Sequence, residues 1–265
     1  MTTRNILVLG AGMIARPLLR YFLTHPAWQV LVATDDVRKA SHLMGEHPRG
    51  RVIALDVRDT AALAPLIAES HVVVSLLPAG FNPAVARLCI AAGRPFVNTS
   101  YTAPEMWALD EAARKAGVLV LNEIGLDPGI DHMSAVALVR SLAYTGATIV
   151  RFESACGGFP AADANTNPWG YKFSWSPQGV MRAGRRPARY VRDGSEIAIS
   201  DRAVFDHSWP FAFGDLGVFE VYPNRDSHAY LAPYGLTGAR GMFRGTIRYP
   251  GWCATMSAAV RLGLL

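Results

Sequence analysis

Short apolar runs alternate with amphipathic segments along the first half of the chain. The apolar runs predict strands at residues 5–9, 29–34, 51–55, 72–77, 95–99 and 118–123. The segments between them predict helices at residues 16–24, 37–44, 62–69, 82–93 and 104–116. Asp59 and Gly93 support two of these bounds, as an N-cap residue and a C′ glycine. This alternation predicts an α/β fold that begins with a doubly wound parallel sheet.

The pattern changes after residue 130. One further helix is predicted at residues 131–142, and the region beyond it is rich in glycine, proline and aromatic residues. Strands are predicted there at residues 149–155 and 218–222. We therefore expect a first domain at residues 1–130 and a second, mixed α+β domain at residues 131–265. The sheet of the second domain should be mixed or antiparallel.

A glycine motif lies between the first predicted strand and the first predicted helix. Gly10 allows a tight turn, Gly12 lets the backbone approach a pyrophosphate, and the small Ala15 allows close helix–strand packing. The helix N-terminus attracts the phosphate charge. We expect Met13 and Ile14, inside the motif, to contact the dinucleotide as well. In this context the motif predicts a Rossmann domain that binds NAD or NADP.

The second strand ends next to two aspartates. Asp35 lies about 20 residues beyond the motif, where a carboxylate would accept a hydrogen bond from the ribose 2′-hydroxyl of NAD. Asp36 is an alternative acceptor, and either residue could instead cap the next helix. A 2′-phosphate beside Asp35 would meet like-charge repulsion, which Arg38 is near enough to offset. Asp35 therefore favours NAD.

Further candidate residues follow the fourth and fifth predicted strands. Ligands of open α/β sheets bind outside the carboxyl ends of the strands. We therefore expect Leu76 and Leu77, after the fourth strand, and Thr99 and Ser100, after the fifth, to line the nicotinamide side. Simple turn formation is the alternative for the last two residues. Tyr101 carries a hydroxyl that could contact a substrate carboxylate or take part in proton transfer.

Composition and charge narrow the function classes. No apolar run reaches the ~20 residues of a membrane-spanning helix, and a strand-like run begins too close to the start for a signal peptide. These features favour the cytoplasm and exclude a membrane partner. The three cysteines are far apart, and no histidine has metal-ligand spacing from them, so no metal is expected. We interpret the most basic stretch as a solvated helix end and turn and expect no nucleic-acid partner; its arginines are Arg182, Arg185, Arg186, Arg189 and Arg192.

Several ordered segments resemble the saccharopine reductases, the glutamate-forming saccharopine dehydrogenases of the aminoadipate route to lysine. The longest covers residues 122–132 and joins the two expected domains. The five segments are NEIGLDPGIDH (122–132), CGGFP (156–160), NPWGYKFSWS (167–176), YPNRDS (222–227) and RGTIRY (244–249). They are spread over most of the chain and are more specific than the glycine motif alone.

The resemblance implies a reaction and a set of site residues. In that family, glutamate and aminoadipate semialdehyde condense to an imine, which hydride from the nicotinamide reduces to saccharopine. By resemblance, Tyr101, Asp127 and Cys156 surround the reacting centre, and Leu126 contacts the cofactor. The residues implied to bind the small amino-acid substrate are Tyr101, Asp127, Gly157, Trp175, Arg225, Arg244 and Thr246.

Alternatives remain for several of these residues. Cys156 could be an inert buried residue, and Arg225 and Arg244 could each pair with a structural carboxylate. We expect Trp169 and Phe173 to belong to the core rather than to stack on substrate.

The chain departs from the family pattern in two places. NADP-using members carry an arginine where this chain has Asp35, which suggests NAD or dual use. The family also continues beyond the position of Leu265, so we expect the C-terminus to be truncated.

Two other functions stay open. One is an imine reductase like carboxynorspermidine dehydrogenase, whose product has one carboxylate where saccharopine has three. The other is an inactive nucleotide-binding fragment. The sequence also leaves open whether the chain forms a homodimer.

Overall fold

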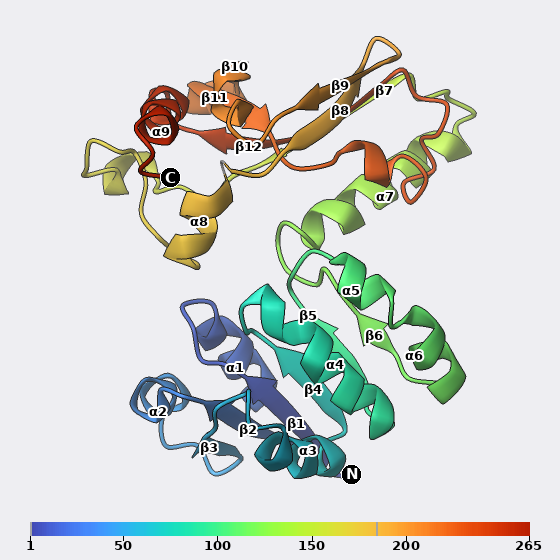
Figure 1. Cartoon of the computed structure of the whole chain (residues 1–265), viewed down its shortest axis with the longest axis vertical. Helices are drawn as coiled ribbons and strands as arrows, with labels where there is room; N and C mark the ends of the chain where they lie inside the picture. The colour runs from blue at the N-terminus through green and yellow to red at the C-terminus, as the bar shows by residue number, and fades with distance from the viewer. Residues whose placement is uncertain (1, 184) are drawn as a thin grey trace. The chain divides into compact units, whose positions relative to one another are not determined.

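The computed structural model describes residues 2–183 and 185–265. Contacts divide the chain into two compact units, of which the first ends at Ile130 and the second runs Asp131–Leu265. Each unit carries its own sheet (Figure 1). Each unit also has its own hydrophobic core. The predicted α/β class with a Rossmann-like parallel sheet is confirmed.

The first unit is built on a six-stranded parallel sheet in the order β3-β2-β1-β4-β5-β6. Its strands are β1 (Arg4–Leu9), β2 (Trp28–Thr34), β3 (Gly50–Ala54), β4 (Val72–Ser75), β5 (Phe96–Asn98) and β6 (Val120–Leu121). The order reverses between β1 and β4, which is the topological switch point where such sheets bind ligands. All six strands end at one edge of the sheet, so the residues that follow them gather there.

Two hydrophobic layers enclose this sheet. One packs α1 (Ala15–Thr24) and α2 (Val37–Met44) on β1, β2 and β3. The other packs α3 (Thr60–Glu69) and α4 (Asn82–Ala91) on the opposite side, together with residues of the short helix α5 (Pro104–Trp107) and of the segment before α6 (Asp110–Ala116). A strand covered on both faces is apolar throughout, which is why β1 is apolar and buried from Ile6 to Leu9.

Within the first unit, the two largest differences from the predicted elements lie at its end. The predicted helix 104–116 is divided into α5 and α6 by a tight turn, in which the backbone N–H of Leu109 bonds to the carbonyl of Met106. Both side chains are buried in the core as a result. The sixth strand is also shorter than predicted, because the backbone turns at Glu123, whose φ is 62°.

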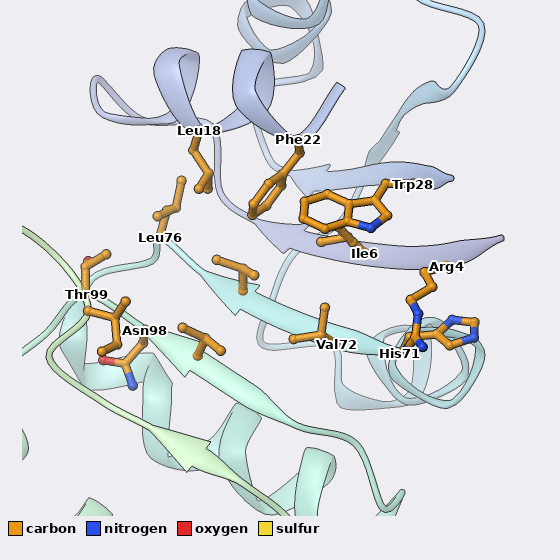
Figure 2. Close-up of a pocket in the computed structure, with 13 residues that line it drawn as sticks. Arg4, Ile6, Leu18, Phe22, Trp28, His71, Val72, Leu76, Asn98 and Thr99 are labelled. Atoms are coloured by element: carbon orange, nitrogen blue, oxygen red, sulfur yellow. The ribbon is translucent and has the colours of Figure 1, made fainter. Parts of the chain in front are cut away.

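An apolar groove of about 400 Å³ runs along the α1 side of the sheet. Leu18 and Phe22 of α1 and Trp28 of β2 face it from one side, and Val72 of β4 faces it from the other (Figure 2). Arg4 and His71 line one end of the groove, and Asn98 and Thr99 line the other. The groove leaves part of β4 and β5 accessible, next to the layer that α1 and α2 cover.

The second unit has a mixed sheet, as predicted. Its strand order is β10-β11-β12-β8-β9, and β7 pairs with β12 in parallel while the other pairs are antiparallel. The strands are β7 (Arg151–Cys156), β8 (Ala188–Arg192), β9 (Ser195–Ile199), β10 (Trp209–Ala212), β11 (Val218–Pro223) and β12 (Gly241–Arg248). The helices are α7 (Ile130–Tyr144), α8 (Pro177–Ala183) and α9 (Trp252–Arg261). This unit differs more from the predicted elements than the first, because no bounds were predicted for β8, β9, β10, β12, α8 and α9.

Two interpretations of the second unit were wrong, the first of them only in part. Arg182 lies in the last turn of α8, and Arg185 and Arg186 are exposed just beyond it, as expected of a solvated helix end and turn. Arg189 and Arg192 instead lie on β8, where Arg189 pairs with Asp226 at 2.5 Å and Arg192 lies over the Trp209 ring.

Trp169 and Phe173, expected in the core, are 55% and 44% exposed. The turn that Asn167 closes onto the carbonyl of Tyr171 buries the tyrosine instead.

Candidate active site

The glycine motif forms the turn between β1 and α1. Gly10 has a φ of 89°, a left-handed conformation that side chains other than glycine rarely adopt. Among the described residues, no atom lies within 4 Å of the position that a side chain at Gly12 would take, which leaves room for a pyrophosphate. Ala15 is fully buried against the sheet, as close helix–strand packing requires. The geometry therefore fits a dinucleotide phosphate at the N-terminus of α1.

Exposed apolar side chains lie at this turn and along the same edge of the sheet. Met13 is 48% exposed and Ile14 is 39% exposed. Leu126, which is 60% exposed, lies elsewhere along this edge, beyond β6. Leu77, after β4, has its Cδ2 atom 3.4 Å from the Cβ position of Gly10, so the loop after β4 lies beside the glycine turn. The faces of a nicotinamide ring pack more favourably against apolar side chains than against water, so apolar side chains at this edge of the sheet suit a nicotinamide site.

The structure separates the two aspartates that follow β2. The side chain of Asp36 caps α2 by accepting a hydrogen bond from the Lys39 backbone N–H at 2.9 Å. Asp35 is exposed, and its contact with the Thr34 hydroxyl is long, at 3.4 Å. Of the two candidates for the ribose 2′-hydroxyl, Asp35 is therefore the one that helix capping does not use.

Polar side chains occupy the carboxyl edge of β4, β5 and β6. Tyr101 donates a hydrogen bond to Oδ1 of Asp127, and the backbone N–H of Thr102 donates to Oε1 of Glu123 at 2.8 Å. Glu123 has a positive φ, a backbone strain that is commonly found at functional sites. The first unit thus brings Tyr101 and Asp127 together at the edge where the nicotinamide is expected.

Hydrogen bonds between asparagine and serine side chains link the bases of the same loops. Asn98 donates from Nδ2 to Oδ1 of Asn122 at 2.6 Å, and Asn82 donates from Nδ2 to the Ser100 hydroxyl at 3.2 Å. We did not single out Asn82, Asn98 or Asn122 from the sequence. The signal was the position of each asparagine at the end of a strand or the start of a helix, but turn formation gives the same signal.

In the second unit, three predicted residues share one face of the sheet. Cys156 of β7 is the register partner of Thr246 of β12, and Arg244 lies two residues earlier on the same face as Thr246. Gly157 follows Cys156, and a side chain there would collide with the carbonyl oxygen of Ile247. Chain packing therefore explains this glycine without a substrate.

The two predicted substrate arginines differ in their surroundings. Arg244 is 2% exposed, pairs with the carboxylate of Asp131 and lies over the Tyr230 ring with its Cζ atom 4.4 Å from the centroid. His132 stacks on the same ring and contacts the Tyr234 hydroxyl at 2.5 Å. Arg225 follows β11 with a positive φ of 55°. A carboxylate partner for Arg244 was one of the alternatives left open by the sequence.

Trp175 lies in the loop before α8 and is 40% exposed. Its ring packs on Gly179, where a Cβ atom would come within 2.5 Å of the ring carbon Cζ3.

Across the described part of the chain, His, Cys, Asp and Glu side chains form no group of three suited to a metal ion. No helix of the described residues is long and apolar enough to cross a membrane.

Family comparisons agree with this architecture over both units. Residues 6–121 match the model of the saccharopine dehydrogenase NADP binding domain, and residues 125–265 match the model of the saccharopine dehydrogenase C-terminal domain. The chain belongs to the saccharopine dehydrogenase family. Its first unit is therefore a nicotinamide-dinucleotide-binding domain, and the resemblance seen in the sequence segments is confirmed.

The relatives of this chain are longer proteins. The chain is 38% identical over 261 residues to the saccharopine dehydrogenase (NADP+, L-glutamate-forming) of Schizosaccharomyces pombe, covering 98% of the chain and 58% of that protein. It is 36% identical to the mitochondrial alpha-aminoadipic semialdehyde synthase of Bos taurus, covering 100% of the chain and 29% of that protein.

A solved structure agrees as well. The apo saccharopine dehydrogenase (L-Glu forming) of Saccharomyces cerevisiae superposes with a TM-score of 0.88 at 37% identity, covering 98% of this chain and 58% of that one. The chain thus spans somewhat more than half the length of the saccharopine dehydrogenases that it matches.

Proposed function

We propose that this chain carries the cofactor and substrate sites of an oxidoreductase acting on the CH–NH group of saccharopine. The reaction interconverts saccharopine with L-glutamate and 2-aminoadipate 6-semialdehyde, by hydride transfer to or from NAD(P), in lysine metabolism. The observation that carries the proposal is the Tyr101–Asp127 pair at the carboxyl edge of a dinucleotide-binding sheet. The family membership and the named relatives supply the substrate.

The residues divide between binding and proton handling. The nicotinamide, when bound, accepts or supplies the hydride at the substrate carbon. In the direction of saccharopine oxidation, the secondary amine becomes an imine, which water then cleaves to the aldehyde and the amine of glutamate. A proton leaves the substrate nitrogen in the first step, and the hydroxyl of Tyr101, paired with the carboxylate of Asp127, is suited to orient or accept it.

The second unit offers the groups that would bind the amino-acid substrate. We propose that Arg225 binds a carboxylate of the substrate, because a guanidinium binds carboxylates in a planar, bidentate fashion. The burial of Arg244 and its pairing with Asp131 favour the structural alternative for Arg244. Cys156 and Thr246 are register partners on one face of the sheet, which supports a common binding surface. The partner is thus a small amino-acid molecule; the homodimer and the cytoplasmic location stay predictions.

We further propose that this chain accepts NAD in addition to NADP. The relatives named above and the matched domain model carry NADP in their names. Asp35 argues in the other direction, because its exposed carboxylate would repel a 2′-phosphate and would suit a ribose hydroxyl. Arg38 and Lys39 are exposed nearby and soften the repulsion, which favours dual use rather than exclusion of NADP.

Calorimetric titration of the chain with NADH and NADPH, each with and without saccharopine, tests these proposals. We expect both cofactors to bind, with affinities within about tenfold of each other, and saccharopine to strengthen the binding. Binding of cofactor without any effect of saccharopine would favour an inactive nucleotide-binding fragment. Strong selection of NADPH would reject the role of Asp35.

A further inference from the structure

Asn82 occupies an unusual position at the start of α4. Asn82 is the first residue of α4 and follows the N-cap position, which Phe81 occupies, so its side chain does not serve as the helix cap. Its side chain is instead 2% exposed and turned into the protein. There Oδ1 accepts a hydrogen bond from the Ser75 hydroxyl at 2.7 Å, and Nδ2 donates to the Ser100 hydroxyl at 3.2 Å. Asn82 thus links the end of β4 to the loop that follows β5.

The linked residue, Ser100, is held from three directions. Its side chain accepts from Asn82, its backbone N–H donates to Oδ1 of Asn98 at 2.9 Å, and its carbonyl accepts from the backbone N–H of Glu123 at 3.2 Å. The next residue is Tyr101, which donates to Asp127. A residue fixed at its side chain and at both backbone groups has little conformational freedom. Ser100 therefore fixes the backbone position from which Tyr101 extends.

Simple stability is a weak explanation for this network. Ser75, Asn82 and Asn98 are at most 2% exposed, and matched apolar side chains would fill such sites with little or no loss of stability. The polar groups do, however, favour one geometry, because the bonds Ser75–Asn82, Asn82–Ser100 and Asn98–Asn122 hold at the same time. That geometry lies at the carboxyl ends of β4 and β5, beside the switch point between β1 and β4.

We propose that Asn82 is a positioning residue that, through Ser100, sets the loop carrying Tyr101 against the nicotinamide end of the cofactor. This inference rests on the proposed function, because it takes the cofactor to lie along this edge. It assigns Asn82 no contact with the reacting atoms. The adenine end of the cofactor, near Asp35, should not depend on Asn82.

Saturation-transfer NMR with NADH tests this role in the full chain. We compare Asn82→Ala and Ser100→Ala with Ser70→Ala, which removes a buried serine hydroxyl before the amino end of β4. We expect the first two variants to lower the saturation of nicotinamide protons relative to adenine protons and to weaken NADH binding by roughly three- to tenfold, as for one net hydrogen bond. Ser70→Ala should leave the proton ratio unchanged, and Ser100→Thr, which keeps the hydroxyl, should restore it.

Hydrogen exchange gives a second readout that needs no cofactor. In Asn82→Ala, the amides of residues 98–102 should exchange faster, while those at the amino ends of the strands keep their wild-type rates. An unchanged proton ratio in variants that bind NADH, or unchanged exchange at residues 98–102, would reject the positioning role of Asn82 and leave the proposed function standing. Failure of the wild-type chain to bind either cofactor would reject the proposed function, and this inference with it.

Discussion

Tyr101 and Asp127 are hydrogen-bonded across 26 residues of sequence. The tyrosine follows β5 and the aspartate lies beyond β6, so the parallel sheet brings together two loops that end neighbouring strands. This relationship depends on the strand order and not on any local motif.

Replacing either partner should impair the proposed reaction. We expect Tyr101→Phe and Asp127→Asn each to lower kcat for saccharopine oxidation by roughly a hundredfold, the usual scale for losing a proton-handling group. The double variant should lose no more than the worse single variant, because the two residues act as one unit. Steady-state assays of NAD(P)H formation measure all three. Independent, multiplying losses would contradict a shared role.

Cofactor choice should respond to one of two neighbouring aspartates. Asp35→Ser should raise the affinity for NADPH relative to NADH by about tenfold, because it removes a negative charge near the 2′-phosphate. Asp36→Ser is the matched control, since serine keeps the cap of α2 and should leave the ratio unchanged. Titrations of both variants with both cofactors measure the ratio of the two affinities. A shift of this ratio in Asp36→Ser but not in Asp35→Ser would contradict the prediction and give the role to Asp36.

The three cysteines should differ in their reaction with alkylating agents. Burial raises the pKa of the Cys89 thiol to about 12 and also raises the pKa of Cys253 strongly. At about pH 8, roughly one Cys89 thiol in ten thousand is ionised, whereas Cys156 is partly exposed. Peptide mass spectrometry after brief treatment with iodoacetamide should therefore find Cys156 modified first, and all three cysteines modified in denaturant. Equal labelling of Cys89 in the native protein would contradict its burial.

The link between Asp206 and α9 should depend on pH. The Ser257 hydroxyl donates to Asp206 at 2.5 Å and Arg261 donates at 3.1 Å, and together they hold the carboxyl pKa below its usual range. A lowered pKa stabilises the fold above the pKa of the unfolded chain, about 4, and this stabilisation is lost as the pH falls further.

Ser257→Ala tests this link. We expect it to lower the free energy of unfolding at neutral pH by at most about 1 kcal/mol, because Asp206 is 41% exposed and solvent screens it. The difference from the wild type should shrink below about pH 4. Urea denaturation at several pH values measures it. A difference that stays constant with pH would mean that Ser257 acts through packing alone.

The sequence was informative where one physical signal dominates. The order of apolar runs and helices predicted the parallel sheet, since buried strands must be apolar on both faces. The roles of Gly10 and Ala15 were predictable because they depend only on the local turn between a strand and a helix. The early end of β6 was not predictable, because Glu123 adopts a positive φ that depends on tertiary contacts.

Pairings between distant residues were the least predictable part of the candidate site. A buried arginine such as Arg244 requires a compensating group, but the sequence offers many carboxylates and does not select Asp131. Asn82 was interpreted only as the start of a helix, since the sequence does not show which way a side chain turns. The exposure of Trp169 was missed for the same reason.

The chain passes from the first unit to the second only at residues 130–131. Within this chain, one junction joins two units that each have their own sheet and their own core, which makes the junction a natural place to exchange one unit for another. All of this chain aligns within 29% of the bovine synthase, so the same tandem recurs inside a much larger protein. Exchange of whole units at this one junction is therefore a simple route by which evolution, or an engineer, could pair one cofactor preference with another substrate.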